Sequence, residues 1–326
     1  MNQSLLGLDI GGTKCAVIYG VQESDNLTIV DKSGFATESD RGLNHTLNSI
    51  IRHFDALTKK HNLTSDNVKA IGISCGGPLD SKKGIVMSPP NLPGWDNVPI
   101  VRFITDKFGI KTGIQNDANA CALAEWKFGA GRGTENMIFM TFGTGMGAGL
   151  ILNGRLYSGT NDMAGEAGHI RLSEFGPVGY GKSGSFEGFC SGGGIAQLAR
   201  IMIMEKFQMG EKVSFCKTSE ELQGITAQTV AEAALLEDEL AMEIYRISGE
   251  YLGKGLSVLI DILNPEMIVI GSIFTRSREL LEPYAVEIIR KEALALSAHV
   301  CRIVPARLGE DLGDYAALSV AADLLK

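Results

Sequence analysis

The 326-residue chain carries 30 Lys and Arg against 38 Asp and Glu, a formal net charge of −8, which argues against a nucleic-acid partner because phosphate backbones are bound by clustered basic residues. Its 40 glycines exceed the usual share of about 7%. A chain of this length is expected to form two lobes. We see no signal peptide, bilayer-spanning run or C-x-x-C pair among the six cysteines, and therefore expect a cytoplasmic protein with reduced thiols.

The first 75 residues predict strands around one helix. Residues 5–10 and 15–19 are apolar runs separated by Gly11-Gly12-Thr13-Lys14, which predicts a β-hairpin with its glycines at the turn. A third strand is expected near 27–33, then an amphipathic helix over 43–61 and a buried strand over 68–74. Strands that alternate with helices indicate the α/β class with a mixed sheet.

The rest of the chain continues this alternation. We expect a helix over 95–108, a strand over 112–115 and a helix over 117–128 entered through Asn116. Residues 136–142 and 147–152 repeat the order strand, Gly-rich turn, strand, which predicts a duplicated lobe. After an irregular stretch over 163–194, the expected elements are helices at 195–208 and 237–263, a strand at 267–270 and a last helix at 311–325.

Two Gly-rich hairpins are candidate phosphate-binding sites. The first reads Asp9-Ile10-Gly11-Gly12-Thr13-Lys14, where glycines let backbone amides approach phosphate oxygens and Asp9 is suited to hold Mg²⁺ through water. The second, over 142–149, has four glycines at alternating positions. One such motif alone is explained as well by a tight turn that needs positive φ. Two of them favour a nucleotide bound between two lobes, and neither fits a Walker loop or a dinucleotide fingerprint.

The segment Asn116-Asp117-Ala118-Asn119-Ala120 lies where a predicted strand runs into a helix, and its simplest explanation is a helix cap. Several segments, in this order, together resemble the sugar kinases of the ROK family, a branch of the actin-like ATPase superfamily. The resemblance extends over residues 5–325 and is carried by Asp9 to Lys14, Gly76-Gly77-Pro78, Asn91 to Trp95, Asn116 to Ala120, Gly143 to Gly149, Gly165 to His169 and Glu187.

This resemblance implies a two-lobed, actin-like (ribonuclease H-like) fold, with mixed sheets flanked by helices and with nucleotide and sugar in the cleft between the lobes. The smaller lobe would comprise residues 1–117 plus 309–326, and the larger one residues 118–308. The implied activity is ATP-dependent phosphorylation of a hexose. Glucose at its 6-hydroxyl is the leading substrate, with N-acetylmannosamine, fructose, mannose and allose as alternatives. ATP and Mg²⁺ are the implied cofactors, and a homodimer the implied assembly.

The resemblance also implies roles for individual residues. Asp117 would be the base that accepts the proton of the attacking hydroxyl, a role that phosphoryl transfer gives to a carboxylate. Sugar hydroxyls suit carboxylates and amides, and the expected sugar-binding residues are Gly76, Gly77, Asn91, Asn116, Asp117, Glu166, His169 and Glu187. The expected nucleotide-binding residues are Asp9, Gly11, Gly12, Thr13, Lys14, Gly143, Thr144, Gly145 and Gly271. The family usually has a second glycine where this chain has Ser272.

One segment departs from the family pattern. Most members hold a structural zinc with one His and three Cys just after the Gly165 to His169 motif, but here Val178, Tyr180 and Ser185 stand at the three thiolate positions. A lone His cannot replace four ligands, and we predict that no zinc is bound. We hypothesise that Tyr180 and Phe186 pack in the metal's place.

Two other classes of protein are weighed against the kinase. A sugar-sensing regulator of the same family would carry a DNA-binding helix-turn-helix ahead of the kinase-like part, whereas the phosphate motif here begins at Asp9. A filament-forming or chaperone ATPase of the superfamily would not explain Asn91, Glu166, His169 and Glu187. The sequence therefore favours the kinase.

Overall fold

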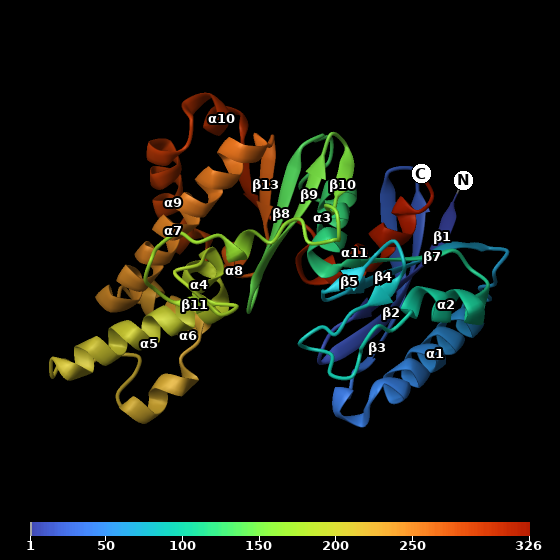
Figure 1. The fold of residues 1–326 in the computed structure, drawn as a ribbon, viewed down its shortest axis with the longest axis horizontal. Helices are drawn as coiled ribbons and strands as arrows, with labels where there is room; N and C mark the ends of the chain where they lie inside the picture. Colours follow the sequence, from blue (N-terminus) through green and yellow to red (C-terminus); the bar gives the residue numbers. More distant parts are fainter. Residues whose placement is uncertain (1) are drawn as a thin grey trace. The chain divides into compact units, whose positions relative to one another are not determined.

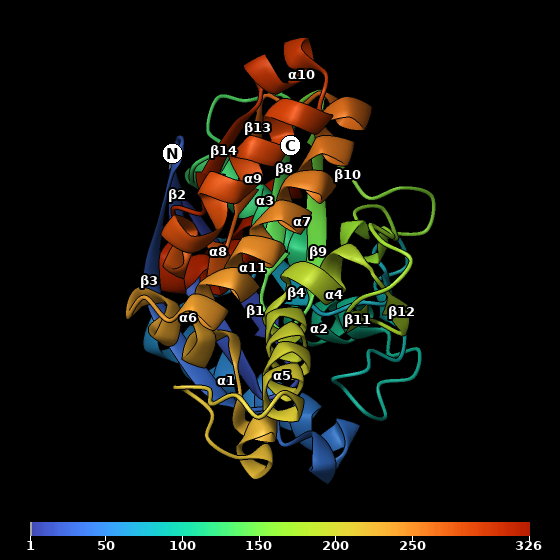
Figure 2. The same ribbon diagram turned by 90° about the vertical axis from the view of Figure 1, so that its left-hand side faces the viewer.

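The computed structural model describes residues 2–326 and divides them into two compact units (Figures 1 and 2). The first unit comprises the chain up to Glu135, Gly149–Ala164 and Arg307–Lys326, and the second comprises Asn136–Ala148 and Gly165–Ala306. This division places residues 118–135 and 149–164 in the first unit, whereas the predicted lobes place them in the larger, second lobe. The lobe boundary at 117 stays a prediction. No helix in the described range is both long and apolar enough to cross a membrane.

The first unit is built on a five-stranded sheet with the order β3-β2-β1-β4-β7. The hairpin strands β1 and β2 are antiparallel, as are β2 and β3, while β4 is parallel to both β1 and β7. The elements of this unit, in chain order, are β1 (Gln3–Ile10), β2 (Lys14–Glu23), β3 (Asn26–Ala36), α1 (Leu43–Lys60), β4 (Val68–Cys75), β5 (Leu79–Asp80), β6 (Ile85–Val86), α2 (Ile100–Phe108), β7 (Thr112–Asn116), α3 (Asp117–Phe128), β10 (Arg155–Tyr157) and α11 (Leu312–Asp323).

The side chains of β1 alternate between the two faces of this sheet, and both faces are buried. Leu6 and Leu8 pack on the side of α1, in a core that includes Ile50 and Phe54. Leu5 points to the opposite face, where it packs in a core with Leu318 and several alanines of α11. The last helix of the chain therefore covers the sheet formed by the first strands, as the ribbon shows (Figure 1).

The second unit holds parallel strands β8, β13 and β14 and a group of helices. The long helix α7 packs closely on α9, because Gly249 and Gly253 leave no side chain between the two backbones. The elements of this unit, in chain order, are β8 (Met137–Phe142), the start of β9 (Met146–Leu152), β11 (Val178–Gly179), β12 (Lys182–Ser183), α4 (Phe186–Cys190), α5 (Gly192–Gln208), α6 (Ala227–Leu235), α7 (Glu239–Leu263), β13 (Met267–Ile270), α8 (Ile273–Arg276), α9 (Arg278–Glu292), α10 (Ala295–Val300) and β14 (Arg302–Pro305).

The second sheet repeats the connectivity of the first. Its order is β10-β9-β8-β13-β14, which matches β3-β2-β1-β4-β7 place by place. The two strands after the hairpin are parallel to each other and to the first hairpin strand in both sheets. This agreement supports the duplication that the two Gly-rich hairpins predicted.

One predicted element is wrong at its start. The helix expected over 95–108 begins only at Ile100. Residues 96 and 97 instead form a turn, in which Asn97 has a φ of 55°, and Val98 exchanges backbone hydrogen bonds with Val86. The cause is Pro99, because a residue that precedes proline is disfavoured in the α region. The stretch expected to be irregular over 163–194 also contains the short helix α4.

Candidate functional site

Parallel strands bring the candidate residues of the first unit to one edge of its sheet. Asp9 near the end of β1 is aligned with Ser74 of β4, and Ser74 is aligned with Gln115 of β7. Asn116 and Asp117 follow Gln115 directly, at the carboxyl end of the strand. Carboxyl ends of parallel strands are where ligands bind in α/β sheets. Asp9 and Asp117 therefore lie at the edge where chemistry is expected.

Asp117 begins helix α3, but the cap is made by its neighbour. The Asn116 side chain accepts a hydrogen bond from the Asn119 amide at 2.7 Å, which confirms the predicted entry into the helix. The Oδ1 atom of Asp117 accepts from the Ala118 amide at 2.8 Å. Solvent reaches the Asp117 side chain, yet surrounding protein raises its pKa by desolvation, against the lowering effect of backbone hydrogen bonds. A carboxylate with both solvent access and a raised pKa suits a general base.

Asp9 has a crowded, negatively charged environment. Burial raises its pKa to about 6, a hydrogen bond with Ser74 lowers it, Asp314 and Asp117 raise it through their charges, and Lys32 lowers it. Lys32 forms an ion pair of 2.7 Å with the buried Asp314. Gly313, in the first turn of α11, faces the Asp9 carboxylate closely, since a Cβ there would lie 3.2 Å from Oδ2. Carboxylate oxygens in a locally negative site fit a hard cation such as Mg²⁺.

The first hairpin needs its glycines for close packing and not for positive φ. Neither Gly11 nor Gly12 has positive φ, so the turn-geometry explanation fails. A Cβ on Gly12 would lie 2.6 Å from the backbone oxygen of Asn91, which places the Asn91 loop directly against the hairpin. The buried Thr37 fixes the turn, donating from Oγ1 to the Gly11 carbonyl at 2.6 Å and from its amide to the Thr13 carbonyl at 3.0 Å.

The second hairpin, between β8 and β9, is held by the segment that carries Glu187. The Glu187 carboxylate accepts a hydrogen bond from the Met146 amide at 2.9 Å, and its Oε2 would lie 3.0 Å from a Cβ on Gly145. Gly192 donates its amide to the Gly143 carbonyl at 2.8 Å. No atom lies within 4 Å of a Cβ on Gly143, so the turn has open space beside it. The structure thus joins Glu187 to the hairpin, a contact that spacing along the chain does not reveal.

His169 and Glu187 lie on a segment that hydrogen bonds and packing hold together. The His169 ring meets the Tyr180 ring edge-on, with centroids 6.3 Å apart, but Tyr180 is 81% exposed, so the packing hypothesised for it is limited to this ring contact. Phe186 instead packs against Gly255 of α7. Among the described residues, no group of three or more His, Cys, Asp and Glu is arranged to hold a metal ion.

The positions of the three absent thiolates have other partners. Ser185 caps α4 by accepting from the Gly188 amide at 3.1 Å. The Gln197 side chain of α5 accepts from the Val178 amide at 2.6 Å and donates to the Val178 carbonyl at 3.3 Å. Lys182 donates to the His169 carbonyl at 2.7 Å. These bonds connect the segment to α4 and α5 with the residues that this chain has.

A cavity of about 740 Å³ in the second unit adjoins the hairpin. Much of its lining is small or apolar, as a planar base requires, and includes Gly143, Thr144, Gly192, Gly193, Ala196, Ile225, Ala227, Ala231, Leu235, Tyr245 and Ile273. Ser272 also lines it, next to the predicted contact Gly271. Ser272 has φ of 52°, a left-handed conformation that favours glycine, and glycine is the residue the family pattern has there.

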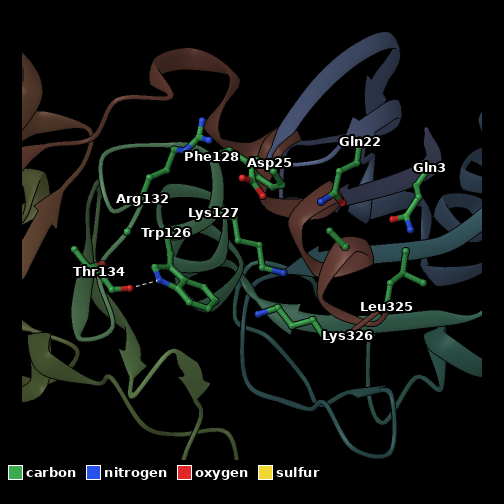
Figure 3. Close-up of a pocket in the computed structure, with 12 residues that line it drawn as sticks. Gln3, Gln22, Asp25, Trp126, Lys127, Phe128, Arg132, Thr134, Leu325 and Lys326 are labelled. Atoms are coloured by element: carbon green, nitrogen blue, oxygen red, sulfur yellow. Dashed lines mark hydrogen bonds between the residues drawn. The ribbon is translucent and has the colours of Figure 1, made fainter. Parts of the chain in front are cut away.

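A second cavity, of about 670 Å³, lies in the first unit and contains none of the predicted site residues (Figure 3). It is lined by the last turn of α3, residues 132–134, the end of α11 and the start of β1. Lys127 and Lys326 both pair with Asp323 there, so their charges are engaged within the protein. Trp126 donates its indole N–H to the Thr134 carbonyl at 2.7 Å (Figure 3).

The predicted sugar-binding residues are divided between the two units. Gly76, Gly77, Asn91, Asn116 and Asp117 belong to the first, and Glu166, His169 and Glu187 to the second. The predicted nucleotide residues are divided in the same way, 9–14 in the first unit and 143–145 with Gly271 in the second. No motif indicates three further residues, because their hydrogen bonds join segments distant in the chain: Thr37 to Gly11, Glu125 to Arg307 and Gln197 to Val178.

Comparisons with known proteins agree on one family. The model of the ROK family matches residues 5–323. The glucokinase of Halalkalibacterium halodurans is 30% identical over 310 residues, which cover 94% of this chain and 92% of the relative. The transcriptional repressor Mlc of Escherichia coli is 28% identical over 85% of this chain and 66% of its own. The structure of a Streptomyces griseus glucokinase in complex with glucose and AMPPNP superposes with a TM-score of 0.74 at 27% identity, covering 98% of this chain and 99% of that one.

Proposed function

The chain belongs to the ROK family, and on that premise we propose that it is an ATP-dependent hexose kinase with Asp117 as the general base. Glucose, phosphorylated at its 6-hydroxyl, is the first substrate to test. The observation that carries the proposal is the edge of the first sheet, where Asp9, Asn116 and Asp117 lie at the carboxyl ends of aligned parallel strands and the pKa of Asp117 is raised. The glucokinase relative and the complex with glucose and AMPPNP support the same chemistry.

The second unit offers features that suit a nucleotide. Its Gly-rich hairpin has open space beside Gly143, as phosphate binding requires, whereas Gly145 faces the Glu187 carboxylate. The adjoining cavity has small and apolar residues on part of its wall and Arg200, Glu232 and Arg276 among the rest, and the apolar part favours a nucleoside triphosphate over a base-free phosphate donor. The Arg200 guanidinium donates to the carbonyls of Leu222 and Ile225 and so holds the wall of this cavity in place.

In the proposed mechanism, residues of this chain orient the sugar, accept its proton and hold Mg²⁺. Asn91, Asn116 and Glu187 orient the sugar, and Asp117 accepts the proton from the hydroxyl as its oxygen attacks the γ-phosphorus and the bond to the β-phosphate oxygen breaks. The raised pKa of Asp117 brings it nearer to the working pH, which favours proton acceptance. Mg²⁺, held by Asp9 through water, would neutralise charge on the phosphates.

A coupled ADP-release assay with MgATP and a panel of hexoses and N-acetylhexosamines tests the proposal. Asp117→Asn should lower kcat by about 10²- to 10⁴-fold, since it keeps the shape and removes the base. Asp106→Asn is the matched control, because Asp106 is an exposed carboxylate on α2 that forms an ion pair with its helix neighbour Arg102. Sugar-dependent turnover that Asp117→Asn leaves intact would exclude Asp117 as the base.

A sugar-sensing regulator is the second candidate, and the similarity to Mlc is the observation that favours it. The same assay separates the two, if it is combined with direct sugar-binding measurements. Sugar binding without turnover for any sugar supports the regulator. Turnover with one or more sugars supports the kinase and names its substrate.

A further inference from the structure

Glu125 is a fully buried carboxylate that the proposed mechanism does not use. It lies in α3, two turns after Asp117, and none of its surface is exposed. It forms no ion pair within the described chain. Burying a carboxylate without a cation is costly unless hydrogen bonds compensate. Here three backbone amides donate to it: Ala130 to Oε2 at 2.7 Å, and Arg307 and Leu308 to Oε1 at 2.8 and 2.9 Å.

The first segment held by Glu125 is the loop that leaves α3. The Glu125 carbonyl accepts from the amides of Gly129 and Gly131, and its side chain accepts from Ala130 between them. Trp126 and Thr134 add further bonds to this loop, from the Trp126 indole to the Thr134 carbonyl and from Thr134 Oγ1 to the Gly131 carbonyl. The loop leads to residue 136, where the chain enters the second unit.

The second segment held by Glu125 is the one by which the chain returns from the second unit to the first. Arg307 is the first residue of the first unit after the second unit ends at Ala306. Leu308 precedes the turn into α11, and the first turn of α11 carries Gly313 and Asp314 beside Asp9. Glu125 thus holds two segments, each near a point where the chain passes between the units. The second of them, residues 307–308, leads directly to α11 and the surroundings of Asp9.

We propose that Glu125 is a positioning residue that fixes the start of α11, and with it the surroundings of Asp9, relative to helix α3 and the base Asp117. It acts through two segments of the chain and not by contact with substrate. Residues 129–131 precede the point where the chain leaves the first unit, and residues 307–308 are where it returns. This inference rests on the proposed kinase activity. A small displacement of reacting groups costs far more in kcat than in substrate affinity, so Glu125 should influence turnover more than sugar binding.

Glu125→Gln tests the inference because it keeps the shape and replaces one carboxylate oxygen by an NH₂ group. An amide cannot accept from both segments, so either Ala130 or the 307–308 pair faces a donor in place of an acceptor. The expected result is a fall in kcat of about 10-fold or more, with the KM for sugar changed less than about threefold. Kinetics are measured well below the unfolding temperature of each variant, as determined by circular dichroism.

Trp126→Phe is the matched control, because it removes one bond to the same loop and none to residues 307–308. It should lower the unfolding temperature and leave kcat within about twofold. A purely structural role for Glu125 predicts that both variants lose stability and retain kcat, which overturns the inference.

Gly129→Ala provides an independent variant if Glu125→Gln does not fold. A Cβ at this position would lie 2.1 Å from Glu125 Oε2 and displace the carboxylate while the charge remains. It should reproduce the selective loss of kcat, and retention of kcat in a folded Gly129→Ala contradicts the inference. A wild-type protein without sugar-dependent turnover overturns the proposed function and this inference together, whereas a fully active Glu125→Gln overturns this inference alone.

Discussion

The Asp9 side chain illustrates how a functional carboxylate opposes stability. Its pKa in the folded protein is raised to about 6, chiefly by burial. The folded state therefore binds this proton more tightly than the unfolded chain does. The resulting contribution to stability is complete below about pH 4, the unfolded pKa, and is lost as the pH rises through about 6. The proposed Mg²⁺-binding role needs the ionised form, so activity should change in the opposite direction.

Asp9→Asn should consequently stabilise the protein at pH 8 and abolish turnover. The expected gain in the free energy of unfolding is about 1–3 kcal/mol at pH 8, and it should vanish at pH 4, where Asp9 is protonated in the wild type. Urea denaturation at the two pH values measures it. Asp80→Asn is the control, because the pKa of Asp80 is lowered and its loss should bring no gain. Equal urea midpoints for wild type and Asp9→Asn at pH 8 would contradict the argument.

Single residues were predictable where a local rule decides them. Asn116 caps α3 as the sequence indicated, because a side chain that accepts from the amide three residues on is a local interaction. Thr37 was not predictable. Its hydroxyl reaches the Gly11 carbonyl across 26 positions of sequence, and only the pairing of β2 with β3 brings them together.

At the scale of elements, the packing of α11 on β4 depends on a strand glycine. A Cβ on Gly72 would lie 2.1 Å from the Ala317 carbonyl and 2.3 Å from the Ala321 amide, both backbone atoms of α11. Gly72→Ala should therefore push the helix off the sheet and cost about 3 kcal/mol or more. Gly34→Ala is the control, since a Cβ on this β3 glycine meets only the Cys15 carbonyl at 3.9 Å. Urea midpoints of the two variants should differ clearly, and similar midpoints would show that α11 adapts.

The segment over 170–187 offers a second test at this scale. Gln197→Ala removes both hydrogen bonds to Val178 and should cost about 1–2 kcal/mol while raising the KM for sugar, because Glu187 lies at the end of this segment. Asn67→Ala, which loses two hydrogen bonds in an exposed turn of the first unit, is the control and should leave the KM for sugar unchanged. Dialysis of the wild type against a strong chelator should leave its unfolding temperature unchanged. A chelator-dependent drop would mean that a metal, and not this hydrogen bonding, holds the segment.

Element types were predictable because hydrophobic periodicity and glycine placement agree with the fold, as in the β1–β2 hairpin and in α7, which is followed by Asn264 in a left-handed conformation. The start of α2 was misjudged because the apolar pattern of residues 95–98 is real: Trp95 and Val98 are buried, but in a loop. Periodicity reports burial, and Pro99 alone signals that the backbone there is not helical.

At the scale of the whole molecule, the chain order does not follow the spatial units. The first unit is assembled from three separate stretches of chain, and its sheet is covered by a helix from the far end of the sequence. Sequence pattern identifies such elements but not their partners, because no local rule relates β4 to residues 316–322. The resemblance to a family implied that residues 309–326 return to the first lobe, and α11 packs against the sheet of the first unit.

The division of the sugar-binding residues between the units leads to a prediction about the whole chain. If glucose contacts Asn91 in one unit and Glu187 in the other, hydrogen exchange of both regions must slow when it binds. At a glucose concentration 100 times the Kd, the linkage amounts to about 2.7 kcal/mol, enough for strong protection in peptides over 86–98 and 165–190. Glu187→Gln should reduce protection in both regions at once, while Glu174→Gln, an exposed carboxylate of the same segment, should leave it unchanged. Protection confined to one unit would mean that the sugar binds there alone, and that the residues of the other unit have a different task.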